Sequence, residues 1–372
     1  MVKETMSPVD DPKRLAVPLN LREARFNDFI WMCCLALKLP NTPMWCGFNA
    51  TRTTDPLPIQ RLCYLPQINM SPTSLSVVVQ TMKMSQQLAE ECDQKYISVT
   101  YDLAIAKLAL CIQAEEAPKF DNIFIQLGHF HITMSFFKAL GKFISDSGGP
   151  YVLTETGALA PGSLQGFLMG KHYNRCKRIH PIFSAALEIL HFQEFIRSTD
   201  DSLVEMEVTS ALKALKNEDF HQLNFIENIS PTLIEIFKKY DSFCQETING
   251  NHGPTAKFWM IYVQLVGVYH QLERAVRTGD HRLYIFLLPQ IANMFFAFNH
   301  PNYARWLTKY HDNLLNMEAS HPGITELFDN GAISIRRTKK NFSRSPIDIT
   351  LEQTINADAA SSSTGININY LI

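Results

Sequence analysis

Apolar and polar positions along the 372 residues follow two different patterns. Residues 96–101 and 122–128 are short, β-rich apolar runs, and each precedes a stretch with helical spacing of apolar residues, at 103–114 and 132–145. Strands and helices alternating at these lengths are typical of parallel strands joined by crossover helices. The pattern therefore predicts a β-α-β-α unit over residues 96–145, preceded by a helix over 74–92.

The second pattern begins after Gly170, where helical periodicity replaces almost all strand signal up to Met317. Strand-like sequence returns only at 332–335, before a further predicted helix near 350–360. This order is typical of one domain inserted into another, and it predicts an α/β core with a large all-α helical insertion, mainly helical overall. The helices expected in the insertion are 175–197, 203–216, 230–246, 255–277, 281–298 and 303–316.

These patterns divide the chain into four predicted parts. Residues 1–43 form a polar lead-in, to about residue 25, and a short helix over 26–39. Residues 44–170 form the α/β core, within which 62–65 is a candidate strand, and residues 171–317 form the helical insertion. Residues 318–372 return to the core and end in a flexible tail.

Composition excludes several classes of protein. A net charge of −2 and a pI of about 6.6 give no global nucleic-acid signature, so any basic surface must be local. The eight cysteines are scattered without a C-x-x-C pair, which argues against a disulfide framework and a zinc ribbon. Neither a phosphate-binding G-x-x-x-x-G-K-[ST] loop nor a G-x-S-x-G nucleophile elbow occurs.

The sequence shows neither a secretory signal nor a membrane-spanning segment. The N-terminus has no apolar signal-peptide core, and no uncharged run reaches the roughly 18 apolar residues that span a bilayer. We therefore expect an intracellular protein, nuclear or cytoplasmic, with no membrane partner.

Candidate chemistry lies where the two predicted strands end. Asp102 follows the first strand and His129 follows the second, and open α/β sheets place their sites at such ends. Asp102 is also a good N-cap for the next helix, and the two roles are compatible. His129 and His131 share a face on an extended backbone and diverge on a helix, so a metal pair and a buried-plus-exposed pair both stay open.

Two local basic clusters flank the predicted insertion. The first contains Lys171, Arg175, Lys177 and Arg178, and the second contains Arg336, Arg337, Lys339 and Lys340, extended by Arg344. Both are candidates for contacts with nucleic-acid phosphates or for import signals, and a solvated surface is the alternative.

Six segments of the chain resemble a multicopy family of uncharacterised animal proteins that look like products or descendants of DNA transposons. These segments are residues 44–49, 64–69, 101–104, 127–131, 299–310 and 351–356, and the resemblance covers about 44–365. It implies a ribonuclease-H-like mixed sheet of the transposase type, in which a helical insertion precedes the last of three acids.

On that resemblance Asp102 corresponds to the first acid and Glu352 to the third. The second position falls on His129, between Gly128 and Phe130, where distant relatives carry an acid. A neutral imidazole cannot replace a carboxylate that bridges two Mg²⁺ ions. The resemblance therefore implies a degenerate site, with Mg²⁺ held by Asp102 and Glu352 only if the protein is active, and we expect it to be inactive.

The leading hypothesis is thus a transposon-derived protein with a catalytically degenerate DDE-type transposase core and DNA as a candidate partner. The alternative is a non-enzymatic, helical protein-interaction module. A third hypothesis is a zinc hydrolase that uses His129 and His131. The sequence leaves the DNA target, the protein partners and the oligomeric state open.

Overall fold

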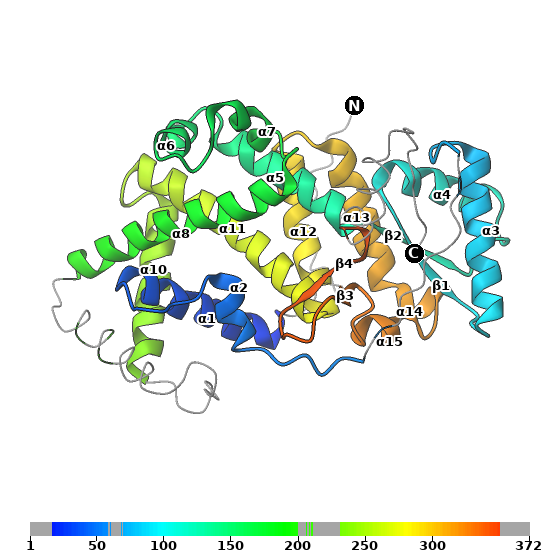
Figure 1. The fold of residues 1–372 in the computed structure, drawn as a ribbon, viewed down its shortest axis with the longest axis horizontal. Helices are drawn as coiled ribbons and strands as arrows, with labels where there is room; N and C mark the ends of the chain where they lie inside the picture. The colour runs from blue at the N-terminus through cyan, green and yellow to red at the C-terminus, as the bar shows by residue number, and fades with distance from the viewer. Residues whose placement is uncertain are drawn as a thin grey trace, which may run out of the picture.

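The structure is a computed structural model that describes residues 17–58, 60, 68, 70–199, 206, 208, 210 and 231–349. It is mainly helical (Figure 1). The predicted strand 62–65, the predicted helix 350–360 and most of the predicted helix 203–216 lie outside these residues. Glu352 lies outside them as well.

The predicted β-α-β-α unit is confirmed. Strand β1 (Ile97–Tyr101) pairs in parallel with β2 (Ile123–Leu127), and helix α4 (Leu103–Glu115) makes the crossover between them. Helix α3 (Leu75–Glu91) precedes β1, and α5 (His129–Ile144) follows β2. All five residues of β2 are buried, which explains why this strand reads as a continuous apolar run.

Two helices begin clearly before the starts predicted from the sequence. Helix α5 begins at His129 rather than at Ile132, directly after Gly128. Helix α1 (Leu19–Ala36) begins seven residues before the predicted start at Phe26, so residues 19–25 are not part of a lead-in. The segment contains leucine, arginine, glutamate and alanine, which have high helix propensity, and this explains the earlier start.

The returning strand does not extend the β1–β2 sheet. Strand β3 (Ser334–Arg336) pairs with β4 (Arg344–Pro346) in a separate antiparallel hairpin. The described residues therefore form two small two-stranded sheets, and they do not show the mixed sheet expected of a ribonuclease-H-like core.

The predicted helices between residues 171 and 317 that fall in described ranges are confirmed to within a few residues. They are α8 (Tyr173–Ser198), α10 (Pro231–Asn249), α11 (Pro254–Thr278), α12 (His281–Ala297) and α13 (Pro301–Leu315). Shorter helices are α2 (Trp45–Ala50), α6 (Gly149–Glu155), α7 (Leu164–Leu168), α14 (Met317–Ser320) and α15 (Ile324–Asp329), with a 3-10 turn η1 (Pro161–Ser163). No helix in the described ranges is long and apolar enough to cross a membrane.

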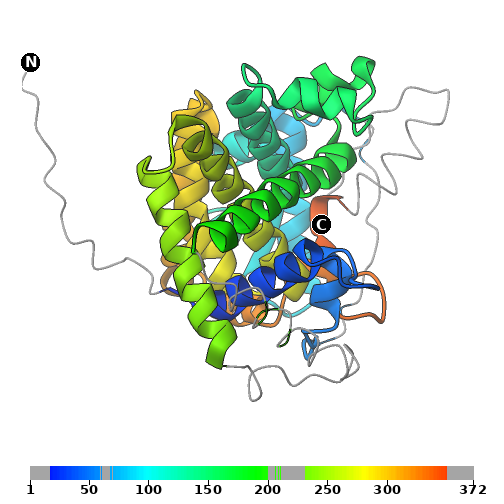
Figure 2. The same ribbon diagram turned by 90° about the vertical axis from the view of Figure 1, so that its left-hand side faces the viewer.

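Buried apolar residues form two clusters that meet at α11. The larger cluster packs β1, β2 and α5 against α11, α12 and α13, and includes Tyr262 and Tyr269 of α11. The smaller one packs α1, α2, α8 and α10 together, and includes Met260 and Val263 of α11. Figure 2 shows α1, α8 and α10 on the side of the molecule that faces the viewer. Helices from the predicted insertion therefore share a core with the strands.

Candidate functional site

The ends of β1 and β2 lie side by side because the strands are parallel and in register. The amide N–H of Gly128 donates a hydrogen bond to the carbonyl oxygen of Tyr101, at 2.8 Å. Asp102 is the N-cap of α4, since its Oδ1 accepts a hydrogen bond from the amide of Ile105, at 2.8 Å. The capping role predicted for Asp102 is confirmed, and its role as a metal ligand stays a prediction.

His129 is a buried residue in the first turn of α5. Its Nε2 lies 3.1 Å from the hydroxyl of Thr133, and the residue is 6% exposed. Burial lowers the pKa of His129 to about 4, although the Asp348 carboxylate acts in the opposite direction. The imidazole is therefore neutral at pH 7.

Because the backbone here is helical, His131 diverges from His129 and is partly exposed. Of the two arrangements left open by the sequence, the structure has the buried-plus-exposed pair. Over the described ranges, no three histidine, cysteine, aspartate or glutamate side chains gather into a group that could hold a metal ion. The proposed triad of Asp102, His129 and Glu352 stays a prediction, because Glu352 lies outside these ranges.

Asp348, which the sequence analysis did not select, reaches the start of α5 instead. Its Oδ2 accepts a hydrogen bond from the amide of Phe130, at 2.7 Å, and lies 3.9 Å from Nδ1 of His131. A Cβ atom at position 128 would lie 2.5 Å from this oxygen, so a residue larger than Gly128 would displace the carboxylate. An anion is favoured here because the N–H groups of a helix start carry partial positive charge.

A small cavity lies beside His129 and Asp348, at the end of β2. Its volume is about 20 Å³, and its lining also includes Thr100, Gln126 and Tyr284. A single water molecule needs roughly 10–15 Å³ of such volume, so the cavity accommodates a water but no nucleotide phosphate with its metal ions.

The two basic clusters approach each other through α11. Lys177 Nζ of α8 and Arg277 Nε of α11 each lie 2.6 Å from Oε1 of the buried Glu273. Arg277 also donates a hydrogen bond to the carbonyl oxygen of Phe342, in the loop of the β3–β4 hairpin. This chain of contacts joins the first turns of α8 to the hairpin, although the two are far apart in the sequence.

The charge of Glu273 is fixed by its two partners. Burial raises the pKa of the carboxyl, but Lys177 and Arg277 together outweigh this effect and lower it to about 2. Glu273 is therefore ionised at neutral pH in spite of its burial.

The predicted nucleic-acid-binding residues separate into two groups. The side chains of Lys177 and Arg336 are partly buried, and each forms an ion pair. Lys177 pairs with Glu273, and Arg336 pairs with Asp55 at 3.5 Å. The other six are exposed at the surface: Lys171, Arg175 and Arg178 at the start of α8, and Arg337, Lys339 and Lys340 on the hairpin. We call these six residues the basic face.

The two elements that carry the basic face lie on one side of the molecule. The start of α8 and the β3–β4 hairpin face the viewer in Figure 1 and lie to the right in Figure 2. Arg344, the extension of the second cluster in the sequence, is instead fully buried and bound to Asp55, at 3.1 Å.

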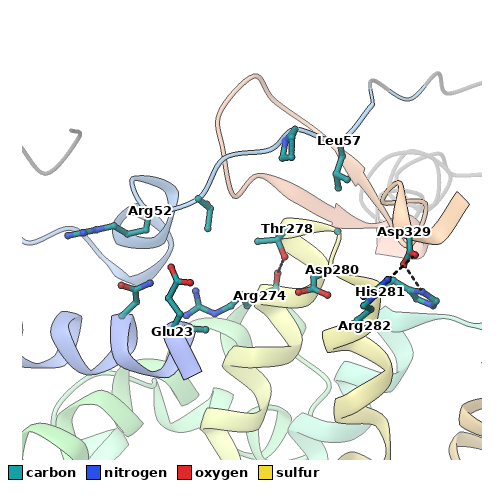
Figure 3. A pocket seen from close by; sticks show the side chains of 14 residues that line it. Glu23, Arg52, Leu57, Arg274, Thr278, Asp280, His281, Arg282 and Asp329 are labelled. Atoms are coloured by element: carbon teal, nitrogen blue, oxygen red, sulfur yellow. Dashed lines mark hydrogen bonds and ion pairs between the residues drawn. The ribbon is translucent and has the colours of Figure 1, made fainter. Parts of the chain in front are cut away.

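A separate cavity of about 480 Å³ lies between α1, the segment after α2, the α11–α12 turn and α15 (Figure 3). Its lining carries acidic and basic side chains in equal number: Glu23, Asp280 and Asp329, and Arg52, Arg274 and Arg282. Arg282 lies 3.8 Å from Asp329. Figure 3 shows Arg52 pointing away from Arg274. Sequence reasoning selected none of the lining residues, and their mixed charges favour no ligand class.

Comparison with known proteins adds one match. The family described as "Domain of unknown function (DUF8702)" matches residues 44–369. No curated protein matches the sequence, and no solved structure matches the fold.

Proposed function

This chain belongs to the DUF8702 family, and we propose that it is a nucleic-acid-binding protein with a catalytically degenerate core of the transposase type. The parallel strand pair, its crossover helix and the capping acid Asp102 support this proposal. A late acid, Asp348, also returns to the strand ends after a long helical block, as in the element order implied by the sequence resemblance.

Strand cleavage is not part of the proposed function. Two-metal phosphoryl transfer requires clustered carboxylate oxygens and room for the substrate phosphates. The end of β2 presents the buried, neutral imidazole of His129, and the Asp348 carboxylate accepts a hydrogen bond from the backbone of α5. The cavity of about 20 Å³ beside them has room for about one water molecule.

The observation that carries the proposal is the basic face. Its six cations lie on two elements that Glu273 and Arg277 bring together, in a chain whose net charge is only −2. Such a local concentration of arginine and lysine attracts phosphates and releases their counterions. Six phosphate contacts would give a slope of about −5 for log affinity against log salt on duplex DNA, and about −4 on a single strand.

Charge neutralisation on the hairpin tests the proposal. The triple variant Arg337→Gln, Lys339→Gln and Lys340→Gln should bind labelled DNA more weakly. The slope of its log affinity against log salt should be smaller in magnitude by about 2–3. The measurement is fluorescence anisotropy between 50 and 200 mM salt. A matched control neutralises three exposed lysines elsewhere, Lys83, Lys238 and Lys239, and should leave the slope near its original value.

Equal losses in both triple variants would show that binding follows total charge, and would refute the basic face as the site. No binding at 50 mM salt would refute the proposed function itself.

The alternative, a helical protein-interaction module, has one observation in its favour. Leu190 on α8 is 63% exposed and Phe296 on α12 is 78% exposed. Phenylalanine is enriched in protein–protein interfaces relative to the rest of the protein surface. If the original protein does not bind DNA at 50 mM salt, this alternative becomes the better explanation.

A further inference from the structure

We propose that a depression beside the start of α8 binds one unpaired nucleotide, with the phosphate on Arg175 and Arg178 and the base against Ile182. The depression has a volume of about 700 Å³ and lies between residues 157–158 and the first turns of α8. Ligand pockets have volumes of about 300–1,000 Å³, so a nucleotide fits this space. The inference deepens the proposed function, because Arg175 and Arg178 belong to the basic face.

The charges of the depression all favour an anion. Its polar lining residues are His172, Tyr173, Asn174, Arg175 and Arg178, with no carboxylate among the lining residues. Arg175 and Arg178 lie three residues apart on α8, so they occupy one face of the helix. In the described part of the chain neither guanidinium forms an ion pair, which leaves their planar N–H groups for the oxygens of a phosphate.

The start of α8 adds to the positive electrostatic potential of the depression. The first turn of α8 contains no acidic residue, and no side chain caps its N–H groups. Those N–H groups contribute partial positive charge at the same end as Arg175. The imidazole of His172 also packs directly on Gly166 of α7, where any Cβ atom would collide with the ring, and this contact fixes one wall of the depression.

An apolar wall lies beside the two arginines, so the depression should bind a nucleotide more tightly than inorganic phosphate. Ile179 is buried, whereas Ile182, the next lining residue on the same helix, is 41% exposed. Ile182 lies one helical turn beyond Arg178, so a group joined to a phosphate on Arg178 reaches its side chain. A base in a duplex is stacked and paired, and only an unpaired base presents its faces to such a wall.

Three probes of increasing size test the proposal on the full chain: inorganic phosphate, ribose 5-phosphate and AMP. Titrations monitored by calorimetry should give the tightest binding for AMP and the weakest for phosphate. The double variant Arg175→Gln and Arg178→Gln should weaken the binding of all three probes about tenfold or more. Single-stranded oligonucleotides should bind the original protein more tightly than duplexes, and this preference should disappear in the double variant.

The base contact has its own test. Ile182→Ser should reduce the affinity for AMP to that for ribose 5-phosphate, while Leu190→Ser should leave it unchanged. Leu190 is exposed on the same helix but does not line the depression, so it controls for loss of apolar surface. Circular dichroism of each variant at the titration temperature reports whether the fold is intact.

Equal affinity for AMP and phosphate, or AMP binding unchanged in the arginine double variant, would overturn the nucleotide site. Salt-dependent DNA binding that persists without AMP binding would overturn this inference and leave the proposed function standing. AMP binding without DNA binding would support the nucleotide site and refute the proposed function.

Discussion

Glutamine in place of Glu273 would test whether a buried charge holds the two halves of the basic face together. The substitution keeps the size of the side chain and removes the carboxylate that binds Lys177 and Arg277. Because Glu273 is almost fully buried, its ionised form depends on these two partners. We expect Glu273→Gln to destabilise the protein and to loosen α8 from the hairpin.

The magnitude follows from the pKa of Glu273. A pKa that falls from 4.5 to about 2 on folding corresponds to about 3 kcal/mol of stability at neutral pH. Removal of one partner of a buried ion pair typically costs about 3–5 kcal/mol. Lys177 and Arg277 are 27% and 20% exposed and regain some hydration, so a loss of about 3 kcal/mol is expected.

The lowered pKa of Glu273 also predicts how its contribution to stability changes with pH. The native pKa of Glu273 lies below its ordinary value of 4.5, so the stabilisation is complete above about pH 5.5 and is lost as the pH falls toward 2. The difference in unfolding free energy between the original protein and Glu273→Gln should therefore shrink in acid. Urea unfolding at pH 7 and at pH 3, followed by circular dichroism, measures this difference.

Two results would refute the reasoning. One is a cost below about 1 kcal/mol at pH 7, far under the 3–5 kcal/mol typical of a broken buried pair. The other is a difference that stays constant down to pH 3. A double-mutant cycle with Lys177→Met separates the pairwise interaction from general disruption, since the two costs add only if the pair is uncoupled.

Two further predictions concern other charged groups in the interior. Burial, with a contribution from Asp28, raises the pKa of Glu188 from 4.5 to about 7, so the native protein loses stability as the pH rises from about 4.5 to 7. Glu188→Gln should remove that loss and be more stable than the original protein at pH 8 by about 1–3 kcal/mol, with little difference at pH 4, as urea midpoints would show. Asp55→Ala leaves the guanidinium of Arg344, fully buried, without its carboxylate, and should cost about 3–5 kcal/mol in unfolding free energy. The exposed Asp146→Ala is its control, and equal unfolding midpoints for the two alanine variants would contradict the role given to Asp55.

The sequence predicted those parts of the fold that depend on local pattern. The continuous apolar run of β2 and the periodicity of α4 and α11 identify those elements without tertiary information. Asp102 was predicted as a cap because an N-cap bonds to an amide only three residues away.

The parts that sequence reasoning missed depend on contacts between distant residues. Nothing near residue 129 indicates that α5 begins there, since its first turn is completed by Asp348, 218 residues beyond Phe130. Lys177 and Arg336 look like surface cations in the sequence because their partners, Glu273 and Asp55, are also remote. A local pattern cannot distinguish a solvated cation from one paired in the interior.

The contact between Asp348 and the start of α5 also has a consequence for synthesis of the chain. At about 5–20 residues per second, the ribosome needs roughly 10–40 s to pass from Phe130 to Asp348. For most of that interval β1, β2 and α5 are complete, but the carboxylate that binds the start of α5 has not been synthesised. The nascent chain thus presents an uncapped helix start next to two apolar strands, and premature termination or proteolysis before residue 348 would leave it in that open form.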